Sequence, residues 1–151
     1  MAIYGLQTNY MNKILKTYFG LEKPVLKSKY TYIGLGLAQE GALVNTECFT
    51  EVFDGKPLGN YRRARAVFGE AVDGAISNLN EVSFNTAGED WATSQKPITM
   101  IGVFDTLDYQ DEDGNMIEPL IVLKLPDSVT IKSGETIFLA AGSLNLTLTD
   151  E

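Results

Sequence analysis

The clearest structural pattern in the chain is the stretch Tyr30–Ala38, YTYIGLGLA. Its residues alternate, so that Ile33, Leu35 and Leu37 share one face and the two intervening glycines share the other. A period of two is that of a β-strand. Two glycines on one face of a strand leave room for another backbone or a bulky ring to approach closely. The stretch therefore predicts a strand with an apolar face and a close contact on its glycine face.

Further stretches downstream alternate in the same way and are separated by Asp-Gly and Ser-Gly turns. Many short strands divided by such turns are typical of antiparallel sandwiches and barrels. We therefore predict a mainly β fold, an antiparallel β-sandwich of the jelly-roll or immunoglobulin-like class. The additional predicted strands are Tyr61–Phe68, Val82–Phe84, Ile98–Phe104, Leu120–Leu125, Thr136–Ala140 and Leu144–Thr149.

The N-terminal segment is the one part of the chain with a helical pattern. Between Ile3 and Phe19, apolar residues recur at every fourth position, which lays one apolar stripe along a helix. Gly20 is a natural helix stop. An amphipathic helix of about 12 residues is marginal alone, so its stripe has to be buried against the chain's own sheet or another subunit. The predicted docking stripe consists of Leu6, Tyr10, Ile14 and Tyr18.

This pattern divides the chain into an N-terminal helix with its connector, residues 1–29, and a β-sandwich domain, residues 30–151. A length of 151 residues suffices for one domain with a core of its own. Residues 1–32 contain five lysines and one glutamate, a net charge of +4, which leaves −12 for the rest of a chain of net charge −8. Either a basic segment docks on an acidic surface, such as a neighbouring copy, or a solvated helix precedes an acidic sheet.

Composition argues against several classes of function. The chain has no histidine and one cysteine, Cys48, so the usual general base and zinc ligand are missing and no intrachain disulfide can form. Twenty acidic residues against twelve basic ones argue against a duplex-DNA binder. Apolar runs fall far short of the ~20 residues of a membrane helix, and no export signal pattern is seen. We expect no cofactor, no bound metal, and no nucleic-acid or membrane partner.

The arginines form the most specific cluster of charge. Arg62, Arg63 and Arg65 are the only arginines, and in a strand the last two share a face. Their guanidinium groups could bind anionic sugars, phosphate or an acidic partner. The favoured interpretation is that they pair with carboxylates, within the chain or across a subunit contact. The candidate partner contacts are Tyr61, Arg63, Arg65 and Trp91.

The densest acidic cluster is the loop at residues 108–118, DYQDEDGNMIE. It departs from the calcium-binding loop of EF-hands, because Tyr109 and Leu120 stand where that pattern requires acids. A solvated hairpin tip is the favoured interpretation, and a looser cation site stays open as an alternative.

Several motifs from residue 59 onward come in a particular order: a Gly-rich turn before Tyr-x-Arg, a Gly-Ala-Ile-Ser-Asn segment, a Gly-x-Phe-Asp strand end, and a closing Ala-Ala-Gly-x-Leu-x-Leu-Thr-Leu. They stand at Gly59, Tyr61, Arg63, Phe68, Gly69, Gly74–Asn78, Val82, Phe84, Trp91, Gly102–Asp105, Val129, Ile131, Gly134, Glu135, Ile137, Phe138, Ala140–Gly142, Leu144 and Leu146–Leu148. This order resembles that of small phage tail-fibre-type virion proteins, the Gp80-like family.

The resemblance implies a non-enzymatic bacteriophage virion protein, associated with the tail fibre or baseplate and made in the host cytoplasm. Its expected partners are other virion proteins and copies of itself. The matching positions are mainly turn glycines and core strand residues, so they transfer no catalytic or binding site. Alternatives are a capsid decoration (cement) protein on the phage head, a tip that binds a host-surface glycan, and a polysaccharide depolymerase.

Overall fold

The computed structural model describes residues 2–6, 19, 30–38, 49–53, 56–70 and 72–147. These residues form ten β-strands and no α-helix, and all the strand pairs are antiparallel. The predicted mainly antiparallel β class is therefore confirmed. The strands are β1 (Ala2–Leu6), β2 (Thr31–Leu37), β3 (Thr50–Glu51), β4 (Ala64–Ala66), β5 (Ala75–Ser77), β6 (Val82–Ser83), β7 (Ile98–Phe104), β8 (Ile121–Val129), β9 (Phe138–Leu139) and β10 (Asn145–Thr147).

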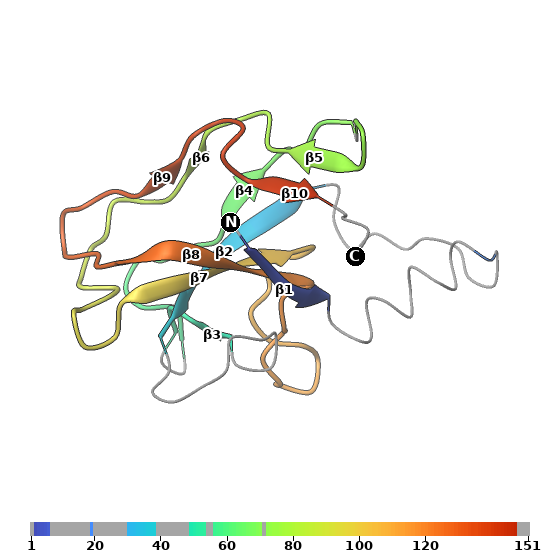
Figure 1. Cartoon of the computed structure of the whole chain (residues 1–151). Coiled ribbons are helices and arrows are strands. Elements are labelled where there is room, and N and C mark those ends of the chain that lie inside the picture. Colours follow the sequence, from blue (N-terminus) through green and yellow to red (C-terminus); the bar gives the residue numbers. More distant parts are fainter. Residues whose placement is uncertain are drawn as a thin grey trace.

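The main sheet has six strands in the order β1-β8-β7-β2-β3, with β4 also paired to β2 (Figure 1). The alternating stretches at Tyr30–Ala38 and Ile98–Phe104 become β2 and β7 at its centre. The register sets Leu35 of β2 opposite Ile101 of β7, which in turn lies opposite Leu123 of β8. All three side chains are buried, so the apolar face of the predicted strand is a core face.

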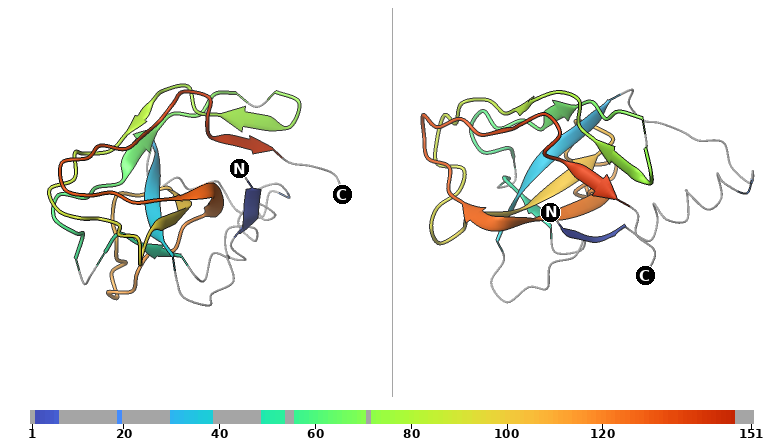
Figure 2. Two further views of the ribbon diagram at one scale, coloured as in Figure 1. Left: turned by 60° about the vertical axis from the view of Figure 1, so that its left-hand side comes forward. Right: turned by 45° about the horizontal axis from the view of Figure 1, so that its top comes forward.

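Two ribbons of two strands each, β5–β10 and β6–β9, lie over this core face (Figures 1 and 2). One continuous apolar core joins them to the main sheet. A sandwich requires a second full sheet, whereas the described residues form two ribbons in that position, so the sandwich stays a prediction. The ribbon layer and its connections contribute the buried side chains of Val82, Phe84, Ile131 and Leu144.

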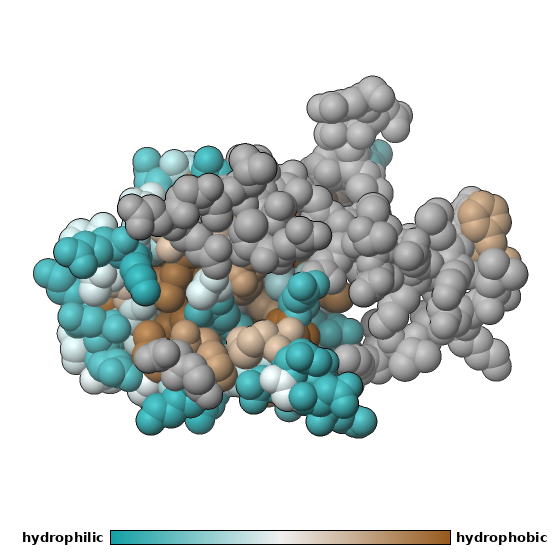
Figure 3. All heavy atoms as spheres, turned by 90° about the horizontal axis from the view of Figure 1, so that it is seen from below, coloured by the Kyte–Doolittle hydropathy of each residue, from teal (hydrophilic) through white to brown (hydrophobic). Residues whose placement is uncertain are grey.

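The opposite face of the main sheet carries the glycines. Gly34 on β2 lies directly across from Gly102 on β7. A Cβ atom on Gly102 would lie only 2.8 Å from ring atoms of both Phe49 and Phe104. Glycine thus lets these two rings lie against the sheet, which confirms the predicted close approach of a bulky ring. Figure 3 views the molecule from the side opposite the ribbons and shows apolar residues gathered between hydrophilic ones.

The predicted place of Leu6 on the stripe of an N-terminal helix is wrong. Residues 2–6 form strand β1, which pairs with β8 and places Leu6 opposite Ile121. The physical reason is that the outer edge of β8 offers unpaired N–H and C=O groups, which a paired strand satisfies and a helix does not. Tyr10, Ile14 and Tyr18 lie outside the described residues, so the rest of the helix stays a prediction.

Several predicted strands are shorter than their alternating patterns. The stretch Tyr61–Phe68 contributes only the three residues of β4, because the side chains just before it enter a polar network described below. Strands β3 and β5 were not predicted. The predicted Asp-Gly turn at residues 73 and 74 is confirmed: Asp73 and Gly74 have φ of 52° and 76°, and the backbones of Val72 and Ala75 are hydrogen-bonded across it.

Candidate functional site

The most densely bonded polar group in the structure lies at a gap in the edge of the main sheet. Strand β4 pairs with β2 at Thr31–Ile33, and β3 pairs with it at Gly36 and Leu37. Between them, the N–H of Leu35 has no strand partner on that edge. The Tyr61 hydroxyl fills the gap by accepting a hydrogen bond from this N–H at 2.9 Å. The hydroxyl in turn donates to Oε1 of Glu51 at 2.7 Å.

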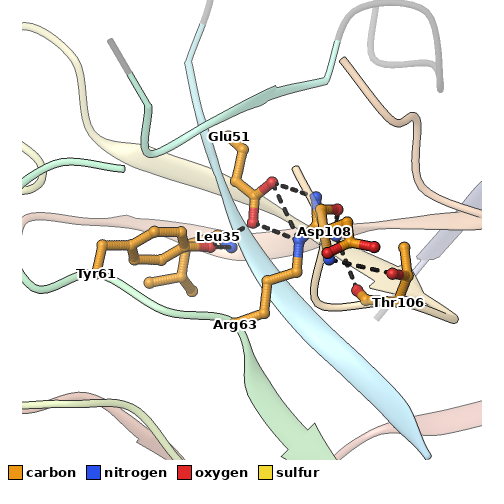
Figure 4. A network of polar contacts seen from close by, with 6 residues as sticks. All are labelled: Leu35, Glu51, Tyr61, Arg63, Thr106 and Asp108. Carbon is orange, nitrogen blue, oxygen red and sulfur yellow. Dashed lines mark hydrogen bonds and ion pairs between the residues drawn. The ribbon is translucent and has the colours of Figure 1, made fainter. Parts of the chain in front are cut away.

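Glu51 and Arg63 form a two-point ion pair beside this tyrosine (Figure 4). Nη2 of Arg63 donates to Oε2 of Glu51 at 2.7 Å, and Nε donates to Oε1 at 2.9 Å. Both side chains are almost fully buried, 0% and 3% exposed for Arg63 and Glu51 respectively. Such forked pairs fix the geometry of both partners, and at this burial each charge depends on the other.

Arg63 also fastens the segment that follows β7. Its Nη1 donates to the backbone oxygens of Thr106 at 2.9 Å and Asp108 at 2.7 Å. The guanidinium carbon lies 3.5 Å from the centroid of the Phe104 ring and 4.8 Å from that of Tyr109. One side chain therefore connects β3, the start of β4 and the loop after β7 on the glycine face of the sheet.

The electrostatics of the network keep its tyrosines neutral. Burial raises the pKa of Tyr61 well above the usual tyrosine value, and the nearby Glu51 carboxylate raises it further. Burial, followed by the same carboxylate, also raises the pKa of Tyr109. Tyr61 is thus held as a hydrogen-bond donor to Glu51, the role that its position requires.

Three of the four predicted partner contacts are interior residues. Counted over the whole residue, backbone included, Tyr61 is 0% exposed, Arg63 4% and Trp91 2%. Trp91 packs edge-on against Tyr61, with ring centroids 5.4 Å apart, and its indole N–H finds no acceptor among the described residues. A glycan on the surface cannot reach these side chains, and we therefore reassign all three to the interior of the fold.

Arg65 alone among these contacts is exposed. Its guanidinium lies 4.3 Å from the centroid of the Tyr30 ring. The favoured prediction that the arginines pair with carboxylates holds for Arg63, whose partner is Glu51. For Arg65 the structure gives an aromatic ring as a neighbour.

Glu51, the acid on which the network depends, was not predicted. The sequence nevertheless contains a sign of it: residues 49–53 read FTEVF, so an extended strand places Glu51 on the same face as Phe49 and Phe53. An acid at a strand position flanked by large apolar residues is buried only with a partner. Its partner is twelve residues away, and only the fold brings the two together.

The acidic loop, residues 108–118, contains hydrogen bonds between one of its carboxylates and its own backbone. The Asp111 carboxylate accepts hydrogen bonds from the N–H groups of Asp113 and Asn115, at 3.0 and 2.9 Å. Within the part of the chain that the structure describes, no group of three or more Asp, Glu, His or Cys side chains is placed to hold a metal ion. The cation alternative gains no support.

The polar groups of this site hold β3, the residue before β4 and the loop after β7 together. Its charges and hydroxyl groups bind one another and the backbone, and they lie beneath the surface. No helix among the described residues is long and apolar enough to span a membrane.

Comparison with known proteins gives the family. The fold is mainly antiparallel β, and its polar network is internal. The family model for Gp80, the podophage GP4 fiber I protein, matches residues 5–147. The chain therefore belongs to this family of phage fibre proteins, as its motifs predict, and its class is that of virion structural proteins. No curated protein matches it.

Proposed function

We propose that this chain is a subunit of a phage tail fibre or of the baseplate region, and that it acts through contacts with other virion proteins and with copies of itself. The observation that carries the proposal is the family match, which extends over residues 5–147. The buried network supports it, because the charges of Arg63 and Glu51 pair with each other inside the fold and are not available to a substrate.

Large apolar side chains on the ribbon layer support assembly. Val72 and Leu79, on either side of β5, are 67% and 66% exposed, and Phe138 of β9 is 57% exposed. Contiguous patches of exposed apolar side chains mark contact surfaces, and these three residues are the candidate positions for such contacts on the ribbon layer. In this proposal, neighbouring subunits cover these three residues.

The N-terminal segment is the second proposed contact. Residues 30–151 form the β unit, and residues 1–29 contribute strand β1 to its edge and a docking segment that carries Tyr10, Ile14 and Tyr18. Leu6 belongs to β1 and contributes through the sheet edge. The basic charge of this segment and the acidic charge of the remainder favour docking between copies.

Complementation of a phage that lacks the gene tests the proposal. Val72→Lys combined with Phe138→Lys is expected to lower the amount of protein in purified virions at least fivefold. The reason is that assembly would bury two charged lysine side chains in the subunit contact. Ser94→Lys, at an exposed loop position, is the matched control and should incorporate normally. Thermal unfolding of the purified variants checks that both fold. Normal incorporation of the double variant would overturn this contact surface.

Light scattering of the purified chain tests self-assembly. We expect a mass that is a defined multiple of the single chain. A monomer at all concentrations would contradict the homo-oligomer.

A further inference from the structure

A groove of about 190 Å³ lies on the glycine face of the main sheet, between strand β3 and residues 116–118 of the acidic loop. One wall is β3 with the phenylalanines that flank it, and the other is the second arm of the loop. The side chains that line the groove include Phe49, Glu51, Phe53, Met116, Ile117 and Glu118. Four of these six are large and apolar, so the groove can receive an apolar side chain of a partner.

Both walls of the groove are held in place by contacts behind them. The Glu51 carboxylate on the β3 side is fixed by the buried network described above. On the other side, the backbone N–H of Ile117 donates to the carbonyl of Tyr109 at 2.8 Å. The Phe49 ring packs edge-on against that of Phe104, with 5.8 Å between the ring centroids. A groove whose walls are already ordered loses little conformational entropy when a partner binds.

The described lining of the groove is apolar and acidic, and it contains no lysine or arginine. The Met116 side chain is 43% exposed, although it is large and apolar. The negative charge of Glu51 is neutralised by its ion pair with Arg63, whereas Glu118 is exposed. The groove therefore favours an apolar group that is accompanied by positive charge.

The loop that supplies one wall adds to this preference. Residues 108–118 contain five acidic residues and no lysine or arginine, a net charge of −5, and all five acids are exposed. They are Asp108, Asp111, Glu112, Asp113 and Glu118. A basic partner that docks beside this loop gains in specificity and in its rate of association.

One segment of the same chain has the matching chemistry. Residues 7–29 contain five lysines and one glutamate, a net charge of +4. The predicted stripe residues Tyr10, Ile14 and Tyr18 belong to the same segment. Large side chains of this kind are typical anchors in the pockets of protein interfaces. The segment thus combines apolar anchors with positive charges in one stretch of sequence.

The topology of the sheet favours the segment of a neighbouring copy. The segment begins after Leu6, at the end of β1, and the chain returns to the sheet at Thr31, the first residue of β2. Strands β1 and β3 lie at opposite edges of the main sheet, and β3 pairs with the last two residues of β2 (Figure 1). Both attachment points of the segment are therefore away from β3, a constraint that does not apply to the segment of a second copy.

We propose that residues 7–29 of one copy dock in this groove of a second copy, with their lysines beside the acidic loop. An apolar side chain of the stripe fills the groove between Phe49, Phe53 and Met116. The inference rests on the proposed self-assembly and deepens it, because it names the surface that receives the N-terminal segment.

Photo-crosslinking of the purified full-length chain tests the proposal. Met116→p-benzoyl-phenylalanine places a light-activated group in the groove. We expect a crosslinked species of twice the chain mass on a denaturing gel, and peptide mapping should place the other end of the link in residues 7–29. Ser94→p-benzoyl-phenylalanine, at an exposed loop position, is the control and should form no such link.

Reversal of one charge provides a second test. Glu118→Lys should weaken self-association at least about tenfold in light scattering over a dilution series, because it places a positive charge beside the lysines of the segment. Asp127→Lys reverses an exposed acid of β8 outside the groove lining and should leave self-association unchanged.

Several results would overturn the proposal. Links from Met116→p-benzoyl-phenylalanine that stay within one chain would assign the groove to the chain's own segment. Links to residues outside 7–29, the absence of any link, or equal weakening by Glu118→Lys and Asp127→Lys would also contradict it. A defined oligomer with any of these results leaves the proposed self-assembly intact, whereas a monomer at all concentrations contradicts both.

Discussion

Arg63 and Glu51 form a buried ion pair across the glycine face of the main sheet, with 2.7 Å between Nη2 and Oε2. The pair joins strand β3 to the residue that precedes β4, two segments that contact β2 at different points. Because Arg63 also holds the backbone of the loop after β7, the pair secures three parts of the chain that are distant in sequence. We expect this pair to make the main polar contribution to the stability of the glycine face.

Removing either partner of the pair should be strongly destabilising. Glu51→Gln or Arg63→Met leaves an uncompensated charge in the interior, which typically costs about 3–5 kcal/mol. The double variant should lose less than the sum of the two single losses, since it removes both charges together. Urea unfolding of the four proteins measures these free energies of unfolding.

Arg65→Met is the matched control for this series. Arg65 is exposed and stacks on Tyr30, so its loss should cost no more than about 1 kcal/mol. Equal destabilisation by Arg63→Met and Arg65→Met would contradict the central place of the buried pair.

Tyr61→Phe should destabilise the fold although it keeps the ring. The Leu35 N–H loses its acceptor at the gap in the sheet edge, and Glu51 loses a donor. A buried donor left without a partner costs about 1–3 kcal/mol. Tyr109→Phe, which removes a hydroxyl that has no hydrogen-bond partner among the described residues, serves as the control in the same unfolding measurements. A neutral effect of Tyr61→Phe would show that the hydroxyl does not support the edge.

Stability should fall at alkaline pH because of the same tyrosine. The pKa of Tyr61 is raised in the folded protein, so above the usual value of about 10 the unfolded chain releases a proton that the folded chain keeps. The unfolded state then binds fewer protons, and the free energy of unfolding drops by about 1.4 kcal/mol per pH unit until the folded group also titrates.

Unfolding of the wild type and Tyr61→Phe between pH 8.5 and 11 measures this contribution. The curve for Tyr61→Phe should fall less steeply than that of the wild type. Parallel decline of the two proteins would mean that Tyr61 is not responsible.

Gly102→Ala should be destabilised by overpacking. Its new Cβ would meet ring atoms of Phe49 and Phe104 at 2.8 Å, and forced shifts of this kind typically cost about 1–3 kcal/mol. Phe49→Leu removes one of the two rings and should recover part of the loss when combined with Gly102→Ala. Strictly additive effects in this double-mutant cycle would contradict the close contact.

Much of the central sheet was predictable from local patterns. Strands β2 and β7 follow the alternation at Tyr30–Ala38 and Ile98–Phe104, and the glycine face admits rings as its composition predicts. The N-terminal strand was not predictable, because the helical spacing of residues 3–19 carries no information about the open edge of β8. Tertiary pairing overrides a local pattern there.

The candidate site shows the limit of reading single residues. Tyr61, Arg63 and Trp91 were named as possible partner contacts, but sequence shows residue type and not depth, and all three side chains are buried. Arg63 can be buried because it pairs with Glu51, twelve residues away, and no local pattern links the two.

Immunogold labelling of purified virions with antibodies against this chain tests its proposed role most directly. We expect label on the tail, at a site that is empty in particles from a phage lacking the gene. Label confined to the head would contradict the tail assignment and favour capsid decoration. Unlabelled particles, with the protein present only in the surrounding lysate, would contradict a virion role altogether.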